Sequence, residues 1–220
     1  MGLLTLMMIV LEVCAAMYAA KHKWLARVML WCMAAFMLIY EIYYYVTHPT
    51  SMPVAFSTFC YFLFGIAVFL PLRPLKSLAA FCSFVAGGLY LCGFIFFPDT
   101  IYARQPNEAG RTIGFLLHHV LLCGGLLLYS QYKVKKTDIA YILGFAAFIV
   151  VYVEVAVHVF HNVNTNNTTV GTIEATVIQL IAPEFVIHWW WYILWYAFVA
   201  AAIWGLWELT SFINRRMLRQ

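Results

Sequence analysis

Long runs of apolar residues, separated by short polar or proline-containing stretches, repeat along the whole chain. Each run is close to the roughly 20 residues that a helix needs to cross a bilayer. The breaks between runs contain charged residues, prolines or glycines, which are typical of helix ends. The pattern therefore predicts seven transmembrane helices, at residues 2–20, 25–46, 54–72, 77–97, 112–132, 139–160 and 185–211.

The composition supports the same class. The chain has 220 residues, of which 65% are hydrophobic and only 10% charged, whereas soluble domains contain about 25% charged residues. Seven spans take up roughly 140 residues, and the remainder forms loops. We therefore expect residues 1–220 to form a single transmembrane helical domain, an all-α polytopic membrane protein of a bacterial plasma membrane or a eukaryotic endomembrane.

Basic residues set the expected orientation. Those that follow the first, third and fifth runs, or lie in the C-terminal tail, are Lys21, Lys23, Arg27, Arg73, Lys76, Lys133, Lys135, Lys136, Arg215, Arg216 and Arg219. Only Arg104 and Arg111 fall on the other side. Cytoplasmic loops carry an excess of Lys and Arg, so we expect the N-terminus outside and the C-terminus in the cytoplasm. Because the basic residues lie at helix ends, the net charge of +4 does not indicate nucleic-acid binding.

Two glycine pairs indicate which helices pack closely. Gly87-Gly88 lies in the fourth run and Gly124-Gly125 in the fifth, at similar depth. Small residues let the backbones of membrane helices approach each other. We therefore expect the fourth and fifth helices to be in close contact, and the fifth carries the adjacent His118 and His119.

Polar side chains within the helices gather at one depth. Ser57 and Cys60 lie about 6 and 10 Å along the third run, and His118 about 10 Å into the fifth, at 1.5 Å per residue. Polar groups in hydrocarbon usually face a protein-lined or wet cavity, so the shared depth predicts a polar pocket in the outer half of the membrane. Its candidate residues are Glu41, Ser57, Cys60, His118, His119, Glu154, His158 and His188. A nucleophile, an imidazole and a carboxylate are all in this set.

Four short motifs between about residues 50 and 210 carry a family resemblance. In chain order they are Pro53-Val54-Ala55-Phe56-Ser57, Gly87-Gly88 with Phe97-Pro98-Asp99, Phe115-Leu116-Leu117-His118-His119, and Ala182-Pro183 with Trp191-Tyr192. They resemble, respectively, a Pro-x-x-x-Cys helix start, a Gly-rich helix ending in Pro-Asp, a histidine-bearing helix and the start of the last helix of YwaF-like integral membrane proteins. This family is related to the eukaryotic transmembrane protein 164 acyltransferases. Ser57 stands where the family has its cysteine, and Cys60 lies one turn further on.

The resemblance implies lipid acyl transfer, or acyl hydrolysis if water is the acceptor. A serine hydroxyl or a thiol needs an adjacent base to become a good nucleophile. We therefore expect either Cys60 or Ser57 to be the nucleophile and either His118 or His119 the base, oriented by Glu154 or Glu41. The substrate-binding set is Glu41, His158 and His188. The expected partners are membrane lipids, with no cofactor.

Two other functions use the same residues. His118, His119, Glu154 and His158, with Glu41 or His188, offer enough nitrogen and oxygen ligands for the site of a metal-dependent membrane enzyme. Alternatively, Glu41 and Glu154 are proton relays of a small-molecule or proton-coupled transporter. The oligomeric state does not follow from the sequence.

Overall fold

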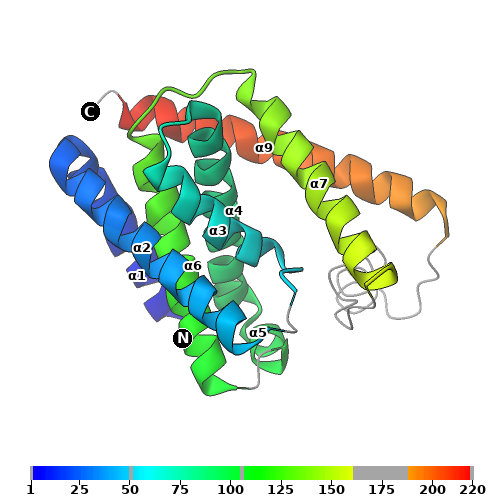
Figure 1. Ribbon diagram of the computed structural model, residues 1–220. Helices are drawn as coiled ribbons and strands as arrows, with labels where there is room; N and C mark the ends of the chain where they lie inside the picture. Colours follow the sequence, from blue (N-terminus) through cyan, green and yellow to red (C-terminus); the bar gives the residue numbers. More distant parts are fainter. Residues whose placement is uncertain (1, 50–51, 105–106, 161–187, 219–220) are drawn as a thin grey trace.

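All regular structure in the described part of the chain is helical. The computed structural model describes residues 2–49, 52–104, 107–160 and 188–218 (Figure 1). Its helices are α1 (Gly2–Lys21), α2 (Lys23–Thr47), α3 (Phe56–Phe69), α4 (Arg73–Phe96), α5 (Pro98–Arg104), α6 (Glu108–Tyr129), α7 (Asp138–His158) and α9 (Trp190–Met217). Seven of them coincide with the predicted runs. The short α5 was not predicted, and residues 182–187 lie outside the described ranges.

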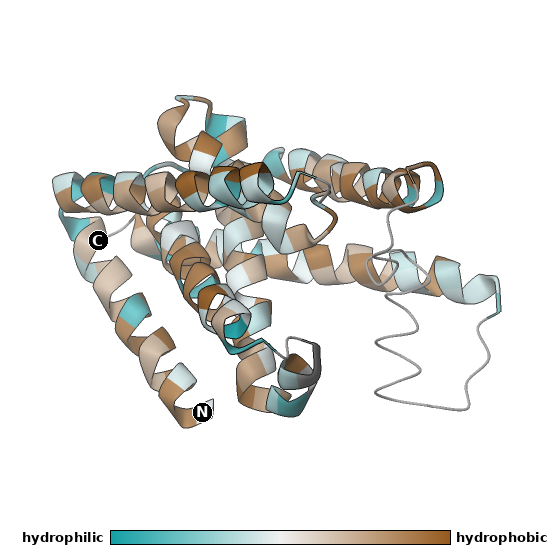
Figure 2. Cartoon of the chain, turned by 60° about the horizontal axis from the view of Figure 1, so that its bottom comes forward, coloured by the Kyte–Doolittle hydropathy of each residue, from teal (hydrophilic) through white to brown (hydrophobic). Residues whose placement is uncertain are grey.

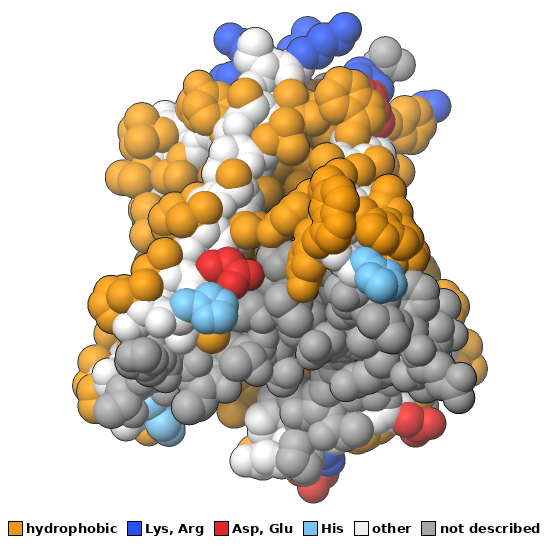
Figure 3. Space-filling model, turned by 90° about the vertical axis from the view of Figure 1, so that its right-hand side faces the viewer, with side chains coloured by type: hydrophobic (Ala, Val, Ile, Leu, Met, Phe, Trp, Pro, Cys, Tyr) orange, Lys and Arg blue, Asp and Glu red, His pale blue; other side chains and the backbone are white. Residues whose placement is uncertain are grey.

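Six helices are long and apolar enough to cross a membrane: α1, α2, α4, α6, α7 and α9. Together they support an integral multi-pass membrane protein. Hydrophobic residues predominate along the helices (Figure 2), and basic side chains gather at one end above a hydrophobic band (Figure 3). The end of the molecule that carries the loop after α6 is called the basic end below, and its cytoplasmic location stays a prediction.

The third predicted helix is shorter than expected. It has 14 residues, which corresponds to about 21 Å, less than the ~30 Å hydrocarbon thickness of a bilayer. Leu70 ends it in an extended conformation, with φ −88° and ψ 137°. The next residue is Pro71, and a residue that precedes proline is driven out of the helical region. Proline therefore ends α3 before it reaches the predicted residue 72.

The two most buried helices, α4 and α6, form the centre of the bundle. Helices α1, α2 and α3 pack around them, whereas α7 and α9 contact the bundle less extensively (Figure 1). Only the C-terminal half of α9 carries buried side chains, among them Trp207, Thr210 and Asn214. The polar groups of α4 and α6 are therefore placed at the centre of the protein.

Glycines permit the contact between α4 and α6. A Cβ atom on Gly87 would lie 2.6 Å from the His118 carbonyl oxygen and 2.7 Å from the Leu122 nitrogen. One on Gly125 would lie 2.8 Å from the nitrogen of Phe84. Real Cβ atoms do not approach backbone atoms so closely, so these two glycines confirm the predicted close packing. Gly88, by contrast, has nothing within 4 Å of its Cβ position.

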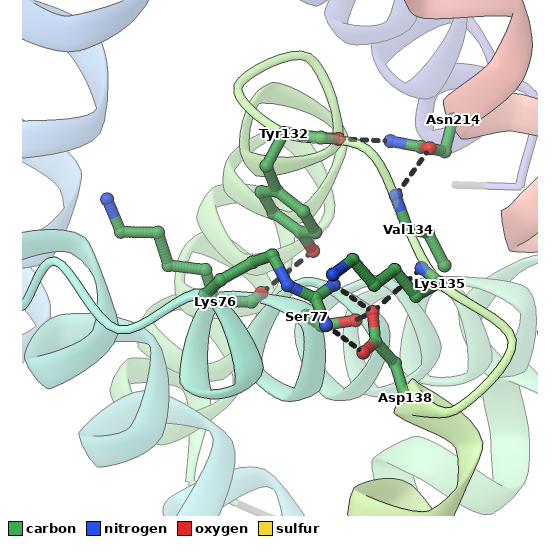
Figure 4. A network of polar contacts seen from close by, with 8 residues as sticks. Lys76, Ser77, Tyr132, Val134, Lys135, Asp138 and Asn214 are labelled. Atoms are coloured by element: carbon green, nitrogen blue, oxygen red, sulfur yellow. Dashed lines mark hydrogen bonds and ion pairs between the residues drawn. The ribbon is translucent and has the colours of Figure 1, made fainter.

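A partly buried ion pair fixes the start of α7 to α4 (Figure 4). Arg73 donates two hydrogen bonds to Asp138, at 2.6 and 2.7 Å. The Ser77 hydroxyl and the Lys135 backbone N–H also donate to this carboxylate, both at 3.0 Å. Asp138 is fully buried, and charge-assisted bonds of this kind are among the strongest in proteins.

Asn214 ties α9 to the loop between α6 and α7. Its side-chain nitrogen donates to the carbonyls of Tyr129 and Tyr132, at 2.6 and 2.8 Å, and its oxygen accepts from the Val134 N–H at 3.1 Å. The Tyr132 hydroxyl donates to the Lys76 carbonyl at 3.0 Å. Burial raises the pKa of Tyr132 well above its ordinary value, so the phenol remains a donor. Three helices are thus joined at the basic end (Figure 4).

The glycine contact predicts that two neighbouring substitutions differ. Gly87→Ala adds a methyl group where the α6 backbone already lies, and overpacking of this kind costs about 1–3 kcal/mol. Gly88→Ala adds the same group in open space and is expected to leave stability unchanged or slightly increased. Thermal unfolding of the two variants in detergent measures the difference, and equal melting temperatures would contradict the packing.

The ion pair predicts a second stability effect. Asp138→Ala leaves the Arg73 guanidinium and two other donors without their acceptor, so we expect a loss of about 3 kcal/mol in the free energy of unfolding. Asp99→Ala is the matched control because Asp99 is exposed. Denaturant unfolding in micelles compares them. If Asp138→Ala were as stable as Asp99→Ala, the loop would not depend on this pair.

Candidate functional site

His118 lies at the meeting point of α3, α4 and α6. Its ring is buried and stacks on Tyr90 of α4, with centroids 3.6 Å apart and planes inclined by 10°. The Tyr61 hydroxyl of α3 lies 3.3 Å from Nδ1 and 3.4 Å from Nε2 of this histidine. One turn earlier on α6, the carbonyl of Gly114 lies 2.6 Å from Nδ1. The imidazole is therefore held on two sides.

The Gly114 carbonyl determines which nitrogen of His118 is available to accept a proton. A carbonyl oxygen can only accept a hydrogen bond, so the neutral ring carries its proton on Nδ1. Nε2 then has a free lone pair, and the Tyr61 hydroxyl is the donor within its reach. A backbone carbonyl that fixes the tautomer in this way is a common feature of functional histidines.

Ser57 reaches the same phenol from the start of α3. It precedes Tyr61 by one helical turn, so both side chains lie on one face, and the Ser57 hydroxyl lies close enough to the Tyr61 phenol to influence it electrostatically. Ser57 is half-buried, in contrast to His118. The sequence predicted that Ser57 and His118 would share a pocket, and the structure places both near Tyr61, which had not been singled out. Its only sequence signal is its i, i+4 spacing from Ser57.

Cys60 occupies a different face of α3. Its thiol is completely buried and donates to the Cys82 carbonyl of α4, with a distance of 3.6 Å. Cys60 therefore lies against the α4 backbone, whereas Tyr61 is the α3 side chain that faces His118. Of the two predicted nucleophiles, Ser57 is the one that lies near the Tyr61 phenol.

His119 pairs with a carboxylate on α1. Its Nδ1 lies 2.7 Å from Oε1 of Glu12, and the Phe115 ring lies 4.3 Å from the imidazole. Oε2 of Glu12 and both ring nitrogens of His119 are buried and have no hydrogen-bond partner among the described residues, so the 2.7 Å contact is an ion-pair distance without hydrogen-bond geometry. Adjacent residues point about 100° apart on a helix, so the two histidines serve separate neighbours. Glu12 was absent from the predicted site.

Helix α6 begins earlier than the predicted fifth run. It starts at Glu108 because Asn107 caps it, its side-chain oxygen accepting from the Ala109 N–H at 3.0 Å. His118 is therefore about 15 Å from the start of the helix. The prediction began this helix at residue 112 and placed His118 about 10 Å deep.

The remaining candidates do not join His118. Glu154 pairs with His158 one turn on, with 3.2 Å between Oε2 and Nε2, and His158 is exposed. His188 stacks near Trp190, with ring centroids 6.3 Å apart. Glu41 is buried on α2, within electrostatic range of Tyr61. Within the described residues, no three His, Cys, Asp or Glu side chains form a group that could hold a metal ion.

A pocket of about 240 Å³ opens at the end of the bundle opposite the basic end. Arg111 lies over the Tyr102 ring at its rim, 4.9 Å from the centroid. Phe94 and Phe115 line it, with ring centroids 5.2 Å apart. These rings separate the pocket from the histidines, since Phe94 contacts Tyr90 and Phe115 contacts His119. The pocket is at the predicted end of the membrane, but its lining residues are not the predicted ones.

A scan of the chain against protein-family models, and searches of curated proteins and of solved structures, gave no match. The resemblance to YwaF-like proteins therefore stays a prediction.

Proposed function

We propose that the protein is a lipid acyltransferase or acyl hydrolase embedded in the membrane, with its reactive centre in the half opposite the basic end. The observation that supports this proposal is the proximity of Ser57 to the Tyr61 phenol, whose hydroxyl lies 3.4 Å from Nε2 of His118. A half-buried hydroxyl and an oriented imidazole are the two groups that acyl transfer to serine requires.

In the proposed reaction, Ser57 Oγ attacks the carbonyl carbon of a lipid ester. Its proton passes to the Tyr61 oxygen while the Tyr61 proton passes to Nε2 of His118. The tetrahedral intermediate then collapses, the bond to the lysolipid oxygen breaks, and that oxygen takes up the proton from the imidazolium by the same route. An acceptor hydroxyl, or water, attacks the acyl-serine in the second half-reaction and regenerates Ser57.

The position of Ser57 suits a lipid substrate. It is the second residue of α3, so it lies close to the end of the helix, at the depth of the ester groups of a glycerolipid. The neighbouring Phe56 is exposed and extends the apolar surface along which an acyl chain can approach. A lipid therefore reaches Ser57 sideways from the bilayer, without crossing the protein.

Turnover of a phospholipid with a labelled acyl chain tests the proposal. In proteoliposomes we expect Ser57→Ala to lower acyl release or transfer at least about 100-fold, the usual scale for a lost catalytic group. Tyr61→Phe should also slow the reaction, because it interrupts the proton path. Two control variants should keep the activity of the unmodified protein. Thr58→Val removes a hydroxyl that lies near Tyr45, and Cys60→Ala removes the buried thiol. Equal turnover by Ser57→Ala and Thr58→Val would contradict the proposal.

The pair of Glu12 and His119 favours a second candidate function, that of a proton-coupled carrier. Ionisable groups in the middle of a membrane protein commonly mark proton paths. This pair joins α1 to α6 by a 2.7 Å contact, while Oε2 of Glu12 and both ring nitrogens of His119 make no hydrogen bond among the described residues. Glu12 or His119 can therefore bind or release a proton without breaking a hydrogen bond to a third residue.

Proton flux into liposomes, driven by a potassium diffusion potential, distinguishes this candidate. If the protein carries protons through the pair, Glu12→Gln and His119→Gln should abolish the flux, whereas Glu154→Gln, at the exposed pair with His158, should retain it. The turnover of labelled phospholipid should not change in any of the three. Flux that persists in Glu12→Gln, or none in the unmodified protein, would exclude the carrier.

A further inference from the structure

The side of the bundle between α1 and α9 is hollowed, at residues that are not part of the proposed acyl-transfer centre. An open groove of about 460 Å³ runs between α1, α4, α6 and the C-terminal turn of α9. Its lining is apolar apart from Arg216, which lies at one end. The groove faces the bilayer, so its contents come from the membrane.

The groove follows two helices for more than two turns. On α1 its lining extends from Ile9 to Met17, and on α4 from Phe84 to Cys92. Each interval is eight residues, or about 12 Å along the helix. The groove is therefore long enough to hold an extended stretch of an acyl chain.

The positive charge of Arg216 determines which kind of lipid head group suits the groove. Arg216 is exposed and lies over the Phe212 ring, 5.1 Å from the centroid. Within the described residues, no Asp or Glu forms an ion pair with it. Lys21 ends α1 one turn beyond Met17, at the same end of the molecule. Basic groups at a helix end beside a hydrophobic groove attract anionic head groups.

We propose that this groove binds one acyl chain of an anionic phospholipid, with the phosphate held by Arg216. The chain lies along α1, α4 and α6 and covers Leu122 and Leu126 of the central helix. Gly88 supports this occupant because its Cβ position is empty, which leaves the width of a side chain free on the α4 wall. The bound lipid seals the contact between α1 and the centre of the bundle.

Native mass spectrometry of the full chain, with phosphatidylglycerol and phosphatidylcholine as probes, tests the site. We expect phosphatidylglycerol to bind preferentially and Arg216→Gln to weaken its binding about 5-fold, the usual contribution of one basic residue near an anionic lipid. Arg215→Gln is the matched control, because Arg215 is exposed but does not line the groove. Equal effects of the two variants would indicate unspecific charge attraction and overturn the proposal.

Filling the groove provides a test that does not change charge. Gly88→Leu places a side chain where the acyl chain is expected and should reduce phosphatidylglycerol binding at least as much as Arg216→Gln. Gly144→Leu is the control, since Gly144 on α7 also has nothing within 4 Å of its Cβ position but lies outside the groove. Comparable thermal unfolding of the two variants establishes that both are folded. Undiminished lipid binding in Gly88→Leu would show that the groove is not the site.

Discussion

The close approach of α4 and α6 is the contact on which the rest of the structure depends. Gly87 allows it, because any side chain there would collide with the carbonyl oxygen of His118 itself. The same contact brings Tyr90 of α4 within 3.6 Å of the imidazole, as measured between ring centroids. Apolar burial does not distinguish one membrane helix pair from another, whereas close backbone packing does. A glycine thus determines both the packing of the central helices and the position of the histidine.

The two adjacent histidines of α6 face different neighbouring helices. His118 faces α3 and α4, where a backbone carbonyl and two phenols hold a neutral ring. His119 faces α1, where Glu12 supplies a carboxylate. Because neighbouring residues on a helix point about 100° apart, one short segment carries both an imidazole beside the Tyr61 hydroxyl and a carboxylate–imidazole pair. The acyl-transfer and proton-carrier proposals therefore concern separate side chains and can be tested separately.

Features set by residues close together in the sequence were predicted well. Features set by contacts between residues far apart in the sequence were not. The apolar runs gave the helices, and the misplaced ends have local causes, namely Pro71 after α3 and the Asn107 cap of α6. The partners of the polar residues were harder to predict, because depth along a helix does not fix which way a side chain points. Glu12 and Tyr61 were missed for this reason, although each lies on a predicted helix. In an apolar run, a lone carboxylate or aromatic ring is as compatible with a structural role as with a role in a functional site.

The site of a covalent acyl adduct tests the central claim most directly. Purified protein would be incubated with a phospholipid that carries a tagged acyl chain, quenched in acid and analysed by peptide mass spectrometry. The account predicts an acyl group on Ser57, joined by an ester that withstands neutral hydroxylamine, and no adduct in a variant in which His118 is replaced by Gln. An adduct on Cys60, which would be a thioester and would be cleaved by hydroxylamine, or no adduct together with no lipid turnover, would contradict it.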